Sequence, residues 1–532
     1  MPGSPQTASS GIAARIVRAA SAQGINQLAR IVQLFLLVPI CLTAWGTAVY
    51  EDWLLLNSIT GFLLLADLGF VQFTTVKLID AWSRADRERF SREWALALGL
   101  FGALSAALTC ALGLLWAMPG WTSLIPARQL QAAELAPTAV LLSLCMILSI
   151  LVNLGLGAYR ARGDLSRSYH VSSILVVLQT AGVALPAVLG GGPLAAAGGS
   201  CVVTGAMATA VVVDLRWRYP DVTWKAIWPS VDELFRGLRQ AIGYLTSPVA
   251  TTVMMNGPTL ILANSGAPEG AIALFTATRT IAGAARQLPY QFAHPAGVEL
   301  AGLLARGDRE RLSRVYASAS RALAIIVGML SGFTVVAAPL VMTLWTRGKI
   351  TYDPTLMLLL VGTTALCAPA QVAYMLLWYG GYPGLLSRAL ICSTGLAMGL
   401  AVLLAPWFGT RGVAIGLGAG EIIGVAVYLS LLVDRLLERK TATGLLRNFW
   451  ATLFAFSGSA AAGYLLHRLI EPRGWFGLVA FGAAWAVPAV AGIYWLLLSK
   501  SQKMRVTSAA ISFARLIRVR PSMRSANPAD IG

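Results

Sequence analysis

Two arginines inside an otherwise apolar stretch are the residues of this chain best suited to bind a charged group. Arg279 and Arg286 lie seven residues apart. On a helix they stand two turns apart on one face, roughly 10 Å along the axis at about 1.5 Å per residue. Ala282 and Gly283 lie between them and leave room beside the charges. A guanidinium group matches phosphate or carboxylate oxygens in a bidentate way. We therefore interpret the pair as substrate-binding residues, and stabilisation of the helix bundle is the alternative.

Two carboxylates lie in similar surroundings. Asp67 lies near the end of one apolar segment, and Glu421 lies in the middle of another. We interpret Asp67 as part of the same substrate site, where it would hold the arginines by charge, and the alternative is a structural role at a helix end. Glu421 is the candidate for coupling to a proton or a sodium ion, and the alternative is that it satisfies polar groups of a neighbouring helix.

Four glycines surround Glu421 at a spacing of four: Gly412, Gly416, Gly420 and Gly424. This spacing places them on one face of a helix, where a second backbone can approach closely. The pattern GLGAGEIIG superficially resembles a nucleotide-binding loop, but no strand precedes it and it lies inside an apolar segment. We predict that the glycine ladder packs helices together.

The composition indicates that these residues lie in a membrane. The chain of 532 residues is 57% hydrophobic and 12% charged, with a mean hydropathy of +0.69. Soluble domains contain about 25% charged residues. Several apolar runs have about the 20 residues that a helix needs to cross the hydrocarbon core. We predict an all-α polytopic membrane protein, in which ionisable groups inside the spans are costly and therefore candidates for function.

We predict about fourteen transmembrane helices. Their ranges are 31–48, 53–76, 94–118, 136–158, 169–190, 195–213, 240–264, 270–300, 322–346, 354–378, 389–408, 412–433, 448–466 and 475–498. With the N-terminus inside, 33 of the 41 Lys and Arg residues lie in inner segments, 6 in outer loops and 2 within a span. This is the positive-inside bias, so both termini are expected in the cytoplasm. The placement of the positive residues thus orients the chain in the membrane. It explains the net charge of +18 without a nucleic-acid partner.

A charged heptapeptide occurs twice and indicates an internal duplication. DRERFSR begins at Asp86, and DRERLSR begins 222 residues later at Asp308, both in predicted inner loops. An offset of 221 also aligns Arg167 with Arg388. Six spans per half make the repeats parallel, related by an axis along the membrane normal. We interpret the heptapeptide as a solvated loop helix with charge pairs, and a gating role is the alternative.

The duplication divides the chain into four parts. They are an N-terminal six-helix lobe (1–220), a C-terminal six-helix lobe (221–440), two extra transmembrane helices (441–499) and a basic cytoplasmic tail (500–532). The tail is expected to form an interfacial helix on the anionic inner leaflet, or else to be disordered.

The sequence offers little for metal, cofactor or enzyme chemistry. Its six cysteines lie in apolar runs without a CxxC pair, and its three histidines are scattered. Buried thiols are expected, without disulfides, a metal site or a cofactor. The predicted outer loops are short, whereas membrane glycan polymerases and ligases carry a large catalytic outer loop. We therefore predict that the protein is not an enzyme.

Two segments resemble the polysaccharide and O-antigen flippases of the multidrug/oligosaccharidyl-lipid/polysaccharide (MOP) exporter superfamily. One is WGTAVYEDWLLLNSITGFLLLADLGF, whose span ends in Asp-Leu-Gly at residues 67–69. The other is LANSGAPEGAIALFTATRTIAGAARQLPYQFAHPAGVELAGLLARGDRERL, which is similar to the region of spans seven and eight. The resemblance implies a V-shaped pair of six-helix lobes around a central cavity.

The same resemblance implies a function in polysaccharide biosynthesis and export, such as that of O-antigen, lipopolysaccharide or exopolysaccharide. Its expected substrate is a polyprenyl-pyrophosphate-linked oligosaccharide, flipped across the bacterial inner membrane by alternating access. Arg279 and Arg286 would then bind the pyrophosphate. Membrane lipids and a glycan polymerase or other assembly proteins are the implied partners. A multidrug or other cation-coupled antiporter of the same fold is the alternative, and the two extra spans leave the glycan open.

Overall fold

The computed structural model describes most of the chain. The described residues are 5–67, 69–220, 224–228, 230–438 and 441–497, so the predicted basic tail (500–532) lies outside them. Throughout this described part the secondary structure is helical, and it contains no strand.

The helices of the N-terminal half are α1 (Pro5–Gly61), η1 (Phe62–Asp67), α2 (Phe70–Ser83), α3 (Arg87–Ala117), η2 (Trp121–Leu124), α4 (Ala132–Ala161), α5 (Leu165–Val188) and α6 (Pro193–Arg218). Those of the C-terminal half are α7 (Val231–Asn264), α8 (Ala271–Ala305), α9 (Arg309–Thr346), α10 (Pro354–Cys367), α11 (Ala370–Tyr379), α12 (Pro383–Glu421), the π-helix η3 (Ile422–Leu429) and α13 (Ser430–Leu436). Two further helices follow, α14 (Thr441–Ile470) and α15 (Gly474–Leu497).

The described helices account for the predicted number of spans. Nine helical runs are long and apolar enough to cross a membrane, and α10 with α11 form a tenth that is bent by 51°. Two of these nine runs each contain two spans. Their backbone is non-helical at Gly46 (φ 78°) in one and at Gly409 (φ 53°) in the other, and each break separates two helical segments. Helices α7 (34 residues) and α8 (35 residues) are also long enough to cross a membrane, and with them the number of spans is fourteen. The prediction of an all-α polytopic membrane protein is confirmed.

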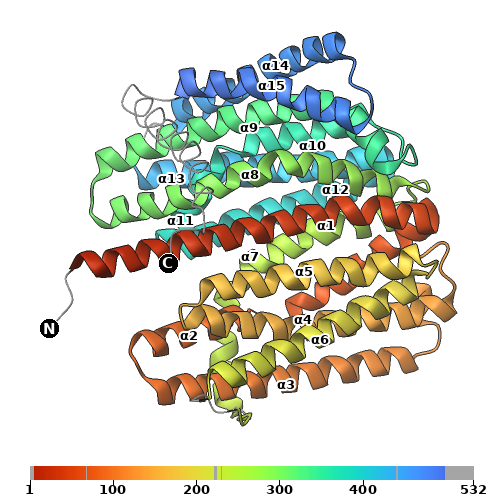
Figure 1. Cartoon of the computed structure of the whole chain (residues 1–532), viewed down its shortest axis with the longest axis vertical. Helices are drawn as coiled ribbons and strands as arrows, with labels where there is room; N and C mark the ends of the chain where they lie inside the picture. The colour runs from red at the N-terminus through yellow and green to blue at the C-terminus, as the bar shows by residue number, and fades with distance from the viewer. Residues whose placement is uncertain (1–4, 68, 221–223, 229, 439–440, 498–532) are drawn as a thin grey trace, which may run out of the picture.

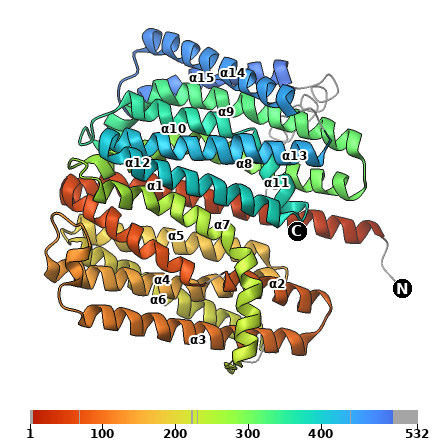
Figure 2. The ribbon, with the colours of Figure 1, turned by 180° about the vertical axis from the view of Figure 1, so that it is seen from behind.

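The helices form two groups that lie side by side (Figure 1). One group contains α2 to α6, and the other contains α8 to α13. Helix α1 lies between the two groups, and α7 crosses between them, as the view from behind shows (Figure 2). Helices α14 and α15 pack on α9 at the margin of the second group. The extra spans therefore extend the C-terminal lobe at its margin and do not lie between the two lobes.

The repeated heptapeptide begins an equivalent helix in each half. Asp86 accepts a hydrogen bond from the backbone N–H of Arg89 (2.9 Å) at the start of α3. Asp308 accepts one from the backbone N–H of Arg311 (3.1 Å) at the start of α9. An aspartate at this position satisfies an N–H group that the helix leaves free, so the motif has a structural role as a helix cap.

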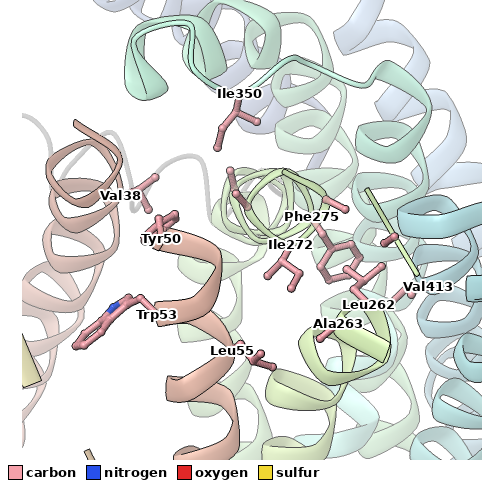
Figure 3. Close-up of a cluster of buried hydrophobic side chains, with 14 of the residues drawn as sticks. Val38, Tyr50, Trp53, Leu55, Leu262, Ala263, Ile272, Phe275, Ile350 and Val413 are labelled. Carbon is pink, nitrogen blue, oxygen red and sulfur yellow. The ribbon is translucent and has the colours of Figure 1, made fainter. Parts of the chain in front are cut away.

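The outer end of the bundle, defined here as the end that carries the loops predicted outside, has one apolar core shared by both halves. Tyr50 and Trp53 of α1 belong to it together with Leu262 of α7 and Phe275 of α8 (Figure 3). The other two described cores lie toward the inner end. One contains residues 70–219 of the N-terminal half, with Trp224 packed against them, and the other contains residues 293–437 of the C-terminal half. The halves are thus joined by apolar packing at the outer end.

The orientation of the bundle is a testable prediction. In a cysteine-free background, a cysteine replacing Arg128 or Arg473 is expected to react with an impermeant maleimide in intact cells. A cysteine replacing Arg89 or Arg309 should react only after permeabilisation, because the positive-inside bias places both in inner loops. Labelling at either of these two positions in intact cells would contradict the predicted topology.

The glycine ladder lies against the first part of its own helix, as its spacing predicts. A Cβ on Gly416 would lie 2.3 Å from the backbone nitrogen of Ala401. One on Gly420 would lie 2.4 Å from the Cβ of Ala397. These distances leave no space for a side chain, so the two parts of α12 pack backbone to backbone across the bend at Gly409.

We expect Gly416→Leu or Gly420→Leu to reduce the amount of folded protein sharply. Overpacking by a few methylene groups costs about 1–3 kcal/mol, and here the nearest neighbours are largely backbone atoms that cannot move aside. Monodisperse protein after detergent extraction is the measurement. Gly395→Leu is the control, since no atom lies within 4 Å of a Cβ built there. An abundant and stable but inactive Gly416→Leu protein would instead indicate a functional ladder.

Candidate functional site

Arg279 lies on α8 and binds the backbone of α7. Its Nη1 donates to the carbonyl oxygen of Met255 (3.1 Å) and its Nη2 to that of Met254 (2.8 Å). Pro258 explains why the latter is available, because proline has no N–H to donate to the carbonyl four residues earlier. The guanidinium group thus satisfies an acceptor that the helix leaves free, and it joins α8 to α7.

We expect Arg279→Ala to destabilise the protein by about 1–3 kcal/mol, because two carbonyl groups of α7, one partly buried and one exposed, lose their charged donor. Thermal unfolding of the purified protein in detergent measures this loss. Arg388→Ala, at an exposed position on α12, is the control and should be close to neutral. Wild-type stability of Arg279→Ala would mean that these hydrogen bonds contribute nothing measurable.

Arg286 lies near Glu421, which belongs to the same lobe. The distance from Arg286 Nη1 to Glu421 Oε1 is 3.8 Å, and the side chains are 26% and 22% exposed. This is an ion pair by distance, but it is too long for a hydrogen bond, which needs about 2.7–3.2 Å. Glu421 also immediately precedes the π-helix η3, and π-helical turns are frequent at functional sites. The guanidinium group of Arg286 therefore keeps capacity for a second partner.

Asp67 lies apart from the arginines. It ends η1 and accepts a hydrogen bond from the backbone N–H of Gly69 (2.7 Å), whose φ of 73° begins α2. Within the described residues it forms no ion pair with Arg279 or Arg286, so the expected contact is absent from this conformation. The reason is positional, because Asp67 belongs to the N-terminal half, whereas Glu421 reaches Arg286 within one lobe.

The structure adds a set of residues that the sequence analysis missed. Glu51 is 5% exposed and accepts three backbone hydrogen bonds, from Gly270 (2.9 Å), Ile272 (2.7 Å) and Ala273 (3.0 Å). These N–H groups form the start of α8, where the helix dipole favours a negative charge. A carboxylate of the N-terminal half therefore caps a helix of the C-terminal half.

The adjacent Asp52 supports this contact from its own side. It is 3% exposed and accepts hydrogen bonds from the backbone N–H groups of Arg128, Gln129 and Leu130 at 2.8–2.9 Å. The loop that it fixes directs the Nη2 of Arg128 to the carbonyl oxygen of Ala267 in the other half (2.6 Å). Asp52 therefore positions Arg128 to cross between the halves.

Two further hydrogen bonds cross at the same end. The Nζ of Lys349 donates to the carbonyl oxygen of Leu42 (2.8 Å), and the Nε1 of Trp345 donates to that of Phe35 (2.7 Å). We call Glu51, Arg128, Trp345 and Lys349, with their acceptors or donors, the outer lock.

One sequence feature could have indicated the lock. Glu51 and Asp52 are adjacent carboxylates at the beginning of an apolar span, with no Lys or Arg between residues 31 and 76 to pair with them. Two acids in that position need partners from elsewhere in the chain.

A further carboxylate at the outer end stabilises the C-terminal lobe. Asp353 caps α10, and Arg411 donates to it from Nε (2.9 Å) and Nη2 (3.3 Å). Partial burial raises the pKa of Asp353, but the hydrogen bonds from Arg411 and from the start of α10 outweigh it and lower the pKa below its ordinary value. Asp353 is thus ionised at neutral pH and fixes the bend of α12 to α10.

No protein-family model matches the sequence, and no curated protein matches it. Solved structures, however, resemble the fold. A multidrug resistance MATE family transporter of the MOP superfamily in its inward-facing conformation is 20% identical, with a TM-score of 0.60 over 80% of this chain and 100% of that chain. An outward-facing MATE family transporter of that superfamily is 20% identical, with a TM-score of 0.55 over 80% and 95%. A MATE crystal structure in complex with MaL6 is 18% identical, with a TM-score of 0.51 over 79% and 98%. The chain shares the fold of these transporters.

Proposed function

We propose that this protein is a membrane transporter that works by alternating access. The observation that supports it is the uneven contact between the lobes. At the outer end they share an apolar core and the outer lock, whereas toward the inner end each lobe has a core of its own. Two rigid bodies joined at one end can rock to open the other. The higher TM-score with the inward-facing transporter (0.60, against 0.55 for the outward-facing one) agrees with this.

The substrate that we propose is a polyprenyl-pyrophosphate-linked oligosaccharide, moved from the inner to the outer leaflet of the bacterial inner membrane. Arg286 would bind the pyrophosphate, because its guanidinium group is partly exposed and not hydrogen-bonded to Glu421. Glu421 would compete with the phosphate for Arg286, so that a proton or cation on Glu421 favours binding. Arg279 would contribute its charge while holding α8 to α7, and Asp67 would approach the arginines only when the lobes close at the inner end.

We further propose the boundaries of the lobes and the location of both termini. The lobes are 1–220 and 221–440, the extra helices 441–499 and the basic tail 500–532, with both termini in the cytoplasm. Membrane lipids and a glycan polymerase or other assembly proteins are the proposed partners.

A second candidate is a cation-coupled exporter of small molecules. The solved structures of this fold are described as multidrug resistance transporters, and Glu421 offers a carboxylate for a coupling ion. In that case Arg286 would regulate Glu421, and no phosphate would be needed.

Proteoliposomes distinguish the two candidates. We expect purified protein to move a fluorescent polyprenyl-pyrophosphate oligosaccharide between leaflets, as measured by quenching with an impermeant reductant. Arg286→Ala should abolish this movement at matched protein levels, and Arg286→Lys should weaken it. Efflux of a cationic dye driven by an ion gradient, without movement of the lipid-linked glycan, would favour the second candidate. Normal glycan movement by both Arg279→Ala and Arg286→Ala would rule out a binding role for the arginines.

A further inference from the structure

Four turns at the outer end of the bundle surround one cavity of about 740 Å³. They are the bend of α1 after Gly46, the loop from α7 to α8, the loop from α9 to α10 and the bend of α12 at Gly409. Ligand pockets have volumes of about 300–1,000 Å³, so this cavity has room for a small organic molecule. Neither Arg286 nor Glu421 lines it, so it is separate from the candidate substrate site.

Two aromatic side chains of α12 line this cavity and remain exposed. Trp407 is 79% exposed and Phe408 is 59% exposed. Exposed aromatic rings at the ends of transmembrane helices commonly belong to the interfacial belt of the bilayer. These two rings differ, because they share a cavity with the charged groups of Lys349 and Arg411. A flat apolar surface beside hydrogen-bond donors suits a sugar ring, which presents C–H bonds on its face and hydroxyl groups at its edge.

The charges around the cavity balance one another. Among the lining residues Lys349 and Arg411 are positive and Glu269 is negative. Arg411 is in turn paired with Asp353 at 2.9 Å, so a second carboxylate compensates the second cation. A strongly anionic or strongly cationic ligand would therefore gain little here. A neutral polar ligand fits the cavity better.

Hydrogen-bonding groups of both kinds lie on the cavity wall. The Nζ of Lys349 donates one N–H to the carbonyl oxygen of Leu42 (2.8 Å), and an ammonium group carries three. Thr47, Thr351 and Thr410 add hydroxyl groups that can donate or accept. The hydroxyl groups of a saccharide also do both, so this wall and a saccharide can satisfy each other.

The cavity also adjoins the outer lock. Gly270, which donates to Glu51 (2.9 Å), and Lys349, which donates to Leu42, both line it. Thr47 belongs to the N-terminal half, whereas the other lining residues belong to the C-terminal half. A ligand that fills the cavity therefore contacts both halves, and separation of the halves at the outer end would remove part of these contacts. Such a ligand favours the closed outer end, because it binds that form more tightly.

We propose that this cavity binds a short neutral oligosaccharide on the outer face of the protein and that the bound saccharide holds the outer end closed. Trp407 and Phe408 stack against its sugar rings, and Thr47 and Lys349 bind its hydroxyl groups from the two halves. The binding is independent of the proposed transport, whereas its consequence for transport rests on that proposal. A glycan that accumulates outside would inhibit its own further export.

The first measurement is the binding of maltotriose and of triacetylchitotriose to the purified full-length protein. Nanodiscs replace detergent, because maltoside detergents carry sugar rings that would compete. We expect saturable binding of at least one trisaccharide, which Trp407→Ala should weaken by about tenfold or more through loss of the stacking surface. Trp475→Ala is the matched control, because Trp475 is a 52% exposed tryptophan at the start of α15 that does not line the cavity.

The second measurement reports the effect on the outer lock. Ala273→Cys introduces a thiol at a fully buried position beside Glu51, where an impermeant maleimide reacts only when the outer end opens. Saturating trisaccharide should slow this reaction by roughly threefold or more, because the bound form is the closed one. The same concentration should have no effect in the Trp407→Ala background.

Several outcomes would overturn the proposal. Absence of saturable binding of both trisaccharides would exclude a saccharide site, and equal affinity in Trp407→Ala would place the saccharide elsewhere. Binding without slower modification of Ala273→Cys would contradict the effect on the outer lock. Slower modification on addition of phosphatidylglycerol to the nanodiscs, without an effect of either trisaccharide, would make the cavity a lipid site. None of these measurements requires transport, so a failure of glycan movement in proteoliposomes is distinguishable from a failure of this proposal.

Discussion

Glu51→Gln is expected to open the outer end of the molecule and to abolish most transport. The carboxylate accepts three backbone hydrogen bonds at the start of α8, and hydrogen bonds to a charged group contribute about 1.5–3 kcal/mol each. An amide has one acceptor oxygen, and its NH₂ group would face N–H donors. Losing about 3 kcal/mol from the closed form alone shifts the population roughly 100-fold, since each 1.4 kcal/mol is tenfold.

Cysteine reactivity measures this opening. Ala273→Cys introduces a thiol at a position that is 0% exposed beside Glu51, and an impermeant maleimide should modify it faster in the Glu51→Gln background. Glu269→Gln is the matched control, because Glu269 lies in the same outer loop with an exposed side chain. Equal reactivity and normal transport in Glu51→Gln would show that the outer lock does not control access.

Arg286→Ala is expected to reduce transport by about 100-fold or more and to destabilise the protein. Removing one member of a buried ion pair costs about 3–5 kcal/mol, because the other charge is left without compensation. The partial exposure of Arg286 and Glu421 places this pair toward the lower end of that range. The double variant Arg286→Ala/Glu421→Ala should recover much of the stability but none of the transport.

Unfolding and transport, measured at matched protein levels, separate the two effects. Asp353→Asn with Arg411→Ala is the control, since that pair lies in the same lobe, is partly exposed and outside the spans, and should cost only about 1 kcal/mol. Full transport by Arg286→Ala would contradict a role in substrate binding. Additive losses of stability from the two single variants would show that Arg286 and Glu421 do not interact.

The sequence by itself determined the features that depend on local pattern. Apolar runs of span length predicted the fourteen crossings, because hydropathy and helix length act within one segment. The spacing of four predicted the close packing of Gly416 and Gly420, since helical periodicity fixes which residues share a face. The repeated heptapeptide marked two equivalent helix starts, each capped by its own aspartate three residues away.

Only the tertiary structure decided which charges meet. Glu51 caps a helix more than 200 residues away, and Arg279 binds a carbonyl that a proline in another helix leaves free. Arg286 pairs with Glu421 of its own lobe, whereas the sequence analysis expects Asp67 to hold the arginines. Spacing along a chain fixes neighbours on one helix, whereas a partner on another helix depends on how the lobes pack.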